Sequence, residues 1–85
     1  NTLDEYAQYV RANPTSGSFV QTLPPIADCA LGQKITIKNV ASNGNTVTVQ
    51  GDANIDGSAS VVLNSSPMKD SITVIKGSST AWDII

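Results

Sequence analysis

The sequence predicts a mainly β protein: a small antiparallel sandwich or barrel-like domain with one short α-helix at its N-terminal end. Short runs of β-branched residues alternate apolar and polar side chains, which is typical of strands half buried on a core. Turn-forming residues separate these runs at intervals of roughly 8–12 residues, as in all-β domains. The first 13 residues differ, because their apolar side chains recur at helical spacing.

The expected helix runs from about Leu3 to Ala12, within an amphipathic segment of residues 1–13. Thr2 and Glu5 are spaced as a capping box at its start. Pro14 ends it, since the residue before a proline is pushed out of the α region. One apolar stripe follows the i, i+3, i+4, i+7 spacing and contains Leu3, Tyr6, Ala7 and Val10.

A linker of residues 14–18 then leads into a β domain of residues 19–85. Its centre, Gly32–Gly51, is predicted to be an antiparallel hairpin, because two alternating runs flank Asn43-Gly44, a strong turn signal. Further strands are expected at Phe19–Leu23, Ser60–Leu63, Ser71–Lys76 and Trp82–Ile85. In the last of these, Trp82 and Ile84 are expected to face inward, while Ile75 points away from Ile72 and Val74.

Composition narrows the possible functions. The 85 residues include five basic and seven acidic side chains, a net charge of −2, without the basic cluster of a nucleic-acid-binding protein. No apolar run reaches the roughly 18 residues of a membrane span, so no membrane insertion is expected. The only cysteine, Cys29, and the lack of histidine exclude an intrachain disulfide, a zinc site and a Cys–His nucleophile. Oligomerisation is the remaining way to stabilise so small a domain.

No catalytic constellation is visible, so we expect neither an enzyme nor a cofactor. Asp52–Gly57 matches the opening of a calcium loop, but position twelve is Leu63 where a bidentate Glu is needed. Its candidate ligands Asp52, Asn54 and Asp56 are therefore interpreted as turn residues. Trp82 could stack on a sugar, although a single Trp in an alternating strand favours a core position.

A series of short motifs follows in a defined order: F-V-Q-T-L-P (19–24), G-Q-K-I-T-I-K-N (32–39), N-T-V-T-V (45–49), N-I-D-G-S (54–58), S-I-T-V-I-K-G (71–77) and W-D-I-I (82–85). This order resembles the small β modules of tailed-bacteriophage virion proteins, particularly tail fibres and tailspikes, over about residues 18–85. The resemblance implies a trimeric, non-enzymatic β module located on the virion. The chain begins at Asn1 rather than Met, so we expect it to be processed or part of a longer protein.

From this resemblance we expect a homotrimer that contacts other virion proteins and a host surface glycan. A threefold assembly would bury apolar side chains between subunits, and the candidates are Leu3, Tyr6, Val10, Ile75 and Ile85. Three loops are the candidate receptor contacts, Asn43–Asn45, Asp52–Gly57 and Asn64–Lys69. The candidate receptor residues are Asn43, Gly44, Asn45, Asn64, Ser65 and Ser66. The alternatives are a capsid head-fibre or decoration protein, and a carbohydrate-binding module of a secreted bacterial protein, which would be monomeric with Trp82 exposed.

Overall fold

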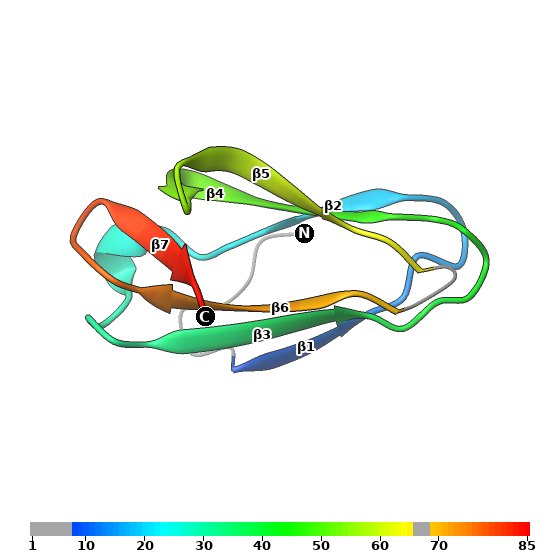
Figure 1. Cartoon of the computed structure of the whole chain (residues 1–85), viewed down its shortest axis with the longest axis horizontal. Coiled ribbons are helices and arrows are strands. Elements are labelled where there is room, and N and C mark those ends of the chain that lie inside the picture. Colours follow the sequence, from blue (N-terminus) through cyan, green and yellow to red (C-terminus); the bar gives the residue numbers. More distant parts are fainter. Residues whose placement is uncertain (1–7, 66–68) are drawn as a thin grey trace.

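The computed structural model describes residues 8–65 and 69–85, and its strands lie in two layers (Figure 1). A single 3-10 turn, η1, spans Ile26–Asp28. The strands are β1 (Tyr9–Ala12), β2 (Phe19–Thr22), β3 (Lys34–Asn39), β4 (Val47–Ile55), β5 (Ser58–Leu63), β6 (Ser71–Lys76) and β7 (Ala81–Ile84). The mainly β class predicted from the sequence is confirmed.

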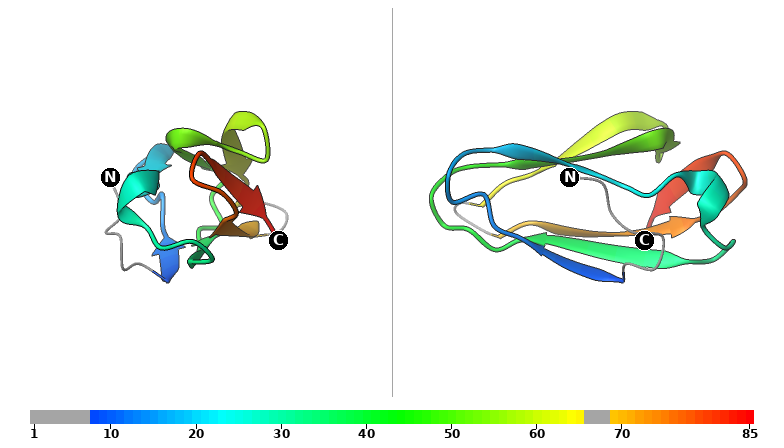
Figure 2. Two further views of the ribbon diagram at one scale, coloured as in Figure 1. Left: turned by 90° about the vertical axis from the view of Figure 1, so that its left-hand side faces the viewer. Right: turned by 180° about the vertical axis from the view of Figure 1, so that it is seen from behind.

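The sheet is curled into a half-barrel. Strands β5, β4 and β2 form one layer, and β1, β3 and β6 form the other. Strand β7 joins the layers at one end, because it pairs antiparallel with β6 and parallel with β4 (Figures 1 and 2). The expectation of a purely antiparallel sheet is wrong, since β1 with β3 and β2 with β4 are also parallel pairs.

The hairpin predicted across Gly32–Gly51 does not form. Strands β3 and β4 lie in opposite layers, and each pairs with other strands. Their inner side chains, all completely buried, line the core from both sides: Ile35, Ile37, Val47 and Val49. We call this arrangement, in which two consecutive strands lie in opposite layers, an arch. Period-two alternation cannot distinguish a hairpin from an arch, because both geometries give each strand one apolar face. Asn43-Gly44 does turn the chain, with a φ of +85° at Gly44, but inside a longer crossing of residues 40–46.

Two arches of this kind are nested. The first runs from β1 through residues 13–18 to β2, and the second from β3 through residues 40–46 to β4. Parallel pairing keeps them in register, with Tyr9 opposite Thr36 in one layer and Phe19 opposite Val47 in the other. The two crossings therefore lie at the same end of the molecule (Figure 1).

The predicted N-terminal helix is wrong over Tyr9–Ala12, which forms β1. The main chain of this segment pairs with β3: Thr36 N–H donates to Gln8 O at 2.8 Å, and Val40 N–H donates to Ala12 O at 2.9 Å. A short amphipathic segment has little helical stability of its own, so an available sheet edge outweighs its helical pattern. The rest of the predicted helix, with Leu3 and Tyr6, lies outside the described residues.

Asp56-Gly57 forms the tight hairpin turn that joins β4 to β5. Both residues have positive φ, 51° and 80°, as a type I′ turn requires. Just before it, the register of β4 against β5 shifts between Gln50 and Ile55. One edge of β4 is therefore shared: β2 occupies it up to Gln50, and β7 occupies it at Asn54 and Ile55. This change of partner allows β7 to close one end of the sandwich.

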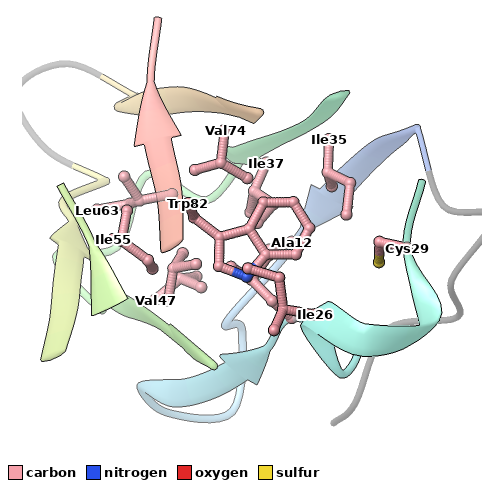
Figure 3. Close-up of a cluster of buried hydrophobic side chains, with 12 residues drawn as sticks. Ala12, Ile26, Cys29, Ile35, Ile37, Val47, Ile55, Leu63, Val74 and Trp82 are labelled. Carbon is pink, nitrogen blue, oxygen red and sulfur yellow. The ribbon is translucent and has the colours of Figure 1, made fainter. Parts of the chain in front are cut away.

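Trp82 lies at the centre of the core, as predicted (Figure 3). Its side chain is 0 % exposed, and its indole lies between Ile37 and Val74 on one side and Ile26 on the other. Gly51 lies beside it, and a Cβ there would be in ordinary contact with the indole nitrogen at 3.7 Å but in tight contact with Leu23 Cβ at 3.2 Å. Ile84 was also expected inward, and it shares the face of Trp82, but it remains 37 % exposed at an open side of the sandwich.

We expect Trp82→Ala to lower the free energy of unfolding by about 3–5 kcal/mol, the usual cost of removing a buried aromatic side chain. That is a large fraction of the stability of a domain of this size. Urea unfolding followed by far-UV circular dichroism measures it. The control is Leu31→Ala, because Leu31 is 71 % exposed and its loss should change stability by less than about 0.5 kcal/mol. Equal effects of the two variants would contradict the assigned core.

Candidate functional site

Three connections between the layers meet at one end of the molecule (Figure 1). We call this end, formed by the described residues 13–18, 40–46, 64–65 and 69–70, the loop end. It brings together the predicted receptor residues Asn43, Gly44, Asn45, Asn64 and Ser65. Ser66, also predicted, lies outside the described residues. The third candidate loop, at Asp52–Gly57, lies toward the opposite end (Figure 1).

The buried carboxamide of Asn39 organises the loop end. It is 0 % exposed, and its Nδ2 donates to Asn45 O at 3.1 Å and to Leu63 O at 3.0 Å. Its Oδ1 accepts from Ala41 N–H at 3.1 Å. Asparagine suits this position because one short side chain carries both donors and an acceptor. These three bonds satisfy backbone groups that would otherwise be buried without partners where the chain changes layer.

Two further asparagines tie the nested crossings together. The Nδ2 atoms of Asn43 and Asn45 both donate to Pro14 O, at 3.1 and 2.8 Å. Asn43 Oδ1 also accepts from Asn45 N–H at 3.0 Å, which forms an Asx turn. Thr46 N–H donates to Ser18 Oγ at 2.8 Å. The two crossings therefore hold each other in place.

Asn64 and Asp70 close the third connection. Asn64 donates to Asp70 Oδ2 from its backbone nitrogen at 3.0 Å and from Nδ2 at 3.3 Å, and Asp70 N–H donates back to Asn64 O at 2.9 Å. Asn39 N–H donates to Asp70 O at 2.9 Å, which joins this clamp to β3. Ser65 is buried, and its hydroxyl has no hydrogen-bond partner among the described residues.

The exposed surface of the loop end is polar and mostly uncharged. Its exposed uncharged hydrogen-bonding side chains are Asn13, Thr15, Ser16, Ser18, Ser42, Asn43 and Asn64, and Lys69 is an exposed charged side chain among the described residues of this end. Because the backbone beneath them is fixed by internal hydrogen bonds, these groups are partly preorganised for a partner. Neutral amides and hydroxyls donate and accept hydrogen bonds without the desolvation cost of charges, so the loop end suits a neutral polar ligand.

The predicted cation ligands have other roles in the structure. Asp52 Oδ1 accepts from Ile26 N–H at 3.1 Å and so holds the start of η1. Asn54 is exposed on β4, and Asp56 forms the hairpin turn. Within residues 8–65 and 69–85, no group of three or more His, Cys, Asp or Glu side chains could hold a metal ion. The turn interpretation is confirmed for Asp56 and Gly57 but wrong for Asp52 and Asn54, which lie in strand β4 because β4 continues to Ile55.

Sequence reasoning missed the role of Lys76. The side chain is only 9 % exposed, and its Nζ donates to Ile26 O and Cys29 O, each at 2.7 Å. The ammonium group thus holds η1 and the following residues against β6. The available signal was alternation, which places Lys76 on the same inner face as Val74. Cys29 itself is buried and not in a disulfide, as expected from a small apolar residue.

The predicted oligomer contacts are separated by the fold. Val10 is half-buried and packs against the core of its own chain. Ile75 and Ile85 share the outer face of the β6 layer, because Ile75 is opposite Asp83 and Ile85 N–H donates to Thr73 O. Ile85 is 63 % exposed, whereas Ile75 is half-buried.

Comparisons with protein-family models, with curated proteins and with solved structures found no match to this chain. Across the described residues, no helix has the length and apolar character needed to cross a membrane. Function therefore has to be inferred from the residues and their arrangement.

We expect Asn39→Ala to lower the free energy of unfolding by about 3 kcal/mol, because it leaves the buried Leu63 carbonyl, the buried Ala41 N–H and the partly buried Asn45 carbonyl without their partner. Urea unfolding measures the change. Asn54→Ala is the matched control, since Asn54 is exposed on β4 and its loss should cost less than about 0.5 kcal/mol. A loss at Asn39 no larger than that at Asn54 would show that the carboxamide does not hold the loop end.

Proposed function

We propose that this chain is a non-enzymatic structural module of a homotrimeric bacteriophage fibre or spike, located on the virion, and that its loop end contacts the host surface. The observation that carries the proposal is that the phage-like motifs coincide with strand ends, a hairpin turn and buried side chains that define the fold. Strand β2 is followed by Leu23-Pro24, and the K-I-T-I-K-N motif ends on Asn39. The I-D-G-S motif contains the β4–β5 turn, and W-D-I-I contains the central Trp82.

The trimer is supported by what the single chain leaves exposed. Strands β1, β2 and β5 are each paired on one side only among the described strands. Free edges invite pairing with another chain, and closed cyclic symmetry satisfies them without open-ended growth. A chain of 85 residues also buries a modest share of its surface, so association adds stability that the core alone does not supply.

Attachment is supported by the chemistry of the loop end. Its exposed amides and hydroxyls can hydrogen-bond to the hydroxyl groups of a neutral host glycan. A head-fibre or decoration protein of the capsid is the alternative within the same class, and other virion proteins would then be the partners of these loops. A carbohydrate-binding module of a secreted bacterial protein is less well supported, because the buried Trp82 offers no stacking surface for a sugar.

Absolute mass in solution tests the assembly. We expect light scattering behind a sizing column to give three times the 8.8 kDa of one chain, unchanged on dilution. A monomer whose melting temperature rises with a glycan would favour the carbohydrate-binding module instead. A monomer without such a shift would overturn the proposal.

Glycan binding tests the loop end. We expect Ser42→Lys to weaken binding of the trimer to neutral glycans on an array by about tenfold, as the loss of roughly 1.4 kcal/mol of contact energy would. The control is Ser79→Lys, an exposed serine in the turn at the opposite end of the molecule (Figure 1). Equal weakening by both variants would point to a general charge effect and contradict a specific role of the loop end.

A further inference from the structure

Among the described residues, the two-layer sheet has unpaired strand edges on two sides, which we call its open sides. On the first open side, β1 pairs only with β3 and β2 only with β4 among the described strands. On the second open side, β5 pairs only with β4, and the end of β7 beyond Trp82 has no further partner among the described strands. The left view of Figure 2 shows both layers end-on, with β5 (yellow-green) and the end of β7 (red) on the same side.

Exposed apolar side chains gather on these two sides. Tyr9 and Val20 lie on the first open side, at 55 % and 41 % exposure. Val62, Ile84 and Ile85 lie on the second. Leu31, in the turn before β3, is the remaining large apolar residue exposed in the part of the chain that the structure describes. Single exposed apolar residues are ordinary, but their concentration on the free edges of a sandwich marks an interaction surface.

The strand register places these residues in matching rows. On the outer face of one layer, Val20 is opposite Thr48, which is opposite Val62. On the outer face of the other layer, the row runs from Tyr9 through Thr36 and Thr73 to Ile85. Each row therefore ends in an apolar side chain on both open sides. A second copy set beside the first, without a shift along the strands, brings Val20 next to Val62 and Tyr9 next to Ile85.

Strand direction fits the same placement. Strand β2 runs parallel to β4 and β5 runs antiparallel to it, so β2 and β5 point in opposite directions. Two copies in the same orientation therefore present β2 and β5 as an antiparallel pair, whose main-chain groups can satisfy each other.

We propose that copies of this chain join edge to edge, with β2 of one copy antiparallel to β5 of the next. The contact is head-to-tail, because it uses different surfaces of the two copies, and three such contacts close a ring about an axis along the strands. The inference rests on the proposed homotrimer and names the surfaces that build it. In the layer that makes this contact, the outer row then packs Val20 against Val62.

Disulfide trapping tests the contact. Opposed residues of neighbouring antiparallel strands have Cα atoms about 4.5–5.5 Å apart, within the range of a disulfide. Val20→Cys and Val62→Cys chains, each also carrying Cys29→Ser, are refolded separately and together and then oxidised, with different mass tags. We expect the mixture to give a cross-link between the two tags at least tenfold more abundant than any self-cross-link of either chain alone. Gln50→Cys, exposed on the central strand β4, replaces Val20→Cys in the control mixture.

The possible outcomes separate the contact from the trimer. Suppose that the wild-type chain is trimeric. If its Val20→Cys and Val62→Cys variants then cross-link no better than the control, or if Val20→Cys links to itself, the edge pairing is overturned and the homotrimer stands. A monomeric wild-type chain overturns both. As a second measurement, Val62→Lys should shift a folded chain to the 8.8 kDa monomer, while Gln50→Lys keeps the trimer mass. Retention of the trimer by Val62→Lys would also overturn the contact.

Discussion

The crossing of the chain between two layers depends on the buried carboxamide of Asn39. Wherever a chain leaves a sheet, its backbone N–H and C=O groups lose their ladder partners, and burial makes that loss costly. Asn39 supplies three replacement bonds within one side chain, to the loop after β3 and to the end of β5. The crossing between β3 and β4 places these strands in opposite layers. The nesting of the two arches and the shape of the loop end depend on the same crossing.

Much of the core could be predicted from the sequence, because alternation and turn chemistry are local signals. They correctly placed Trp82 inside, the inner face of β3, and the turn at Asp56-Gly57. The choice between a hairpin and an arch could not be predicted, since it depends on which strands pair across long distances in the chain. The same limit explains β1, where an edge offered by β3 overrides a helical pattern.

The candidate site was predicted as separate loops, and its assembly was not. Asn43 and Asn64 were identified as loop residues, but only the fold shows that they belong to one end of the molecule. Lys76 escaped prediction because a lysine at the end of a strand ordinarily reaches solvent, whereas the ammonium group of this one donates to the carbonyls of Ile26 and Cys29. In the proposed trimer, with its axis along the strands, three loop ends face the same direction. Weak hydrogen-bonding contacts at each end would then combine through multivalency.

The most direct test of this account is a nuclear Overhauser spectrum of the isotopically labelled chain. The account predicts Asn39 side-chain amide protons that exchange slowly with water and lie close to Asn45 and Leu63, together with cross-strand contacts between Thr36 and Thr73. A rapidly exchanging Asn39 amide, with cross-strand contacts joining β3 directly to β4 as in a hairpin, would contradict it.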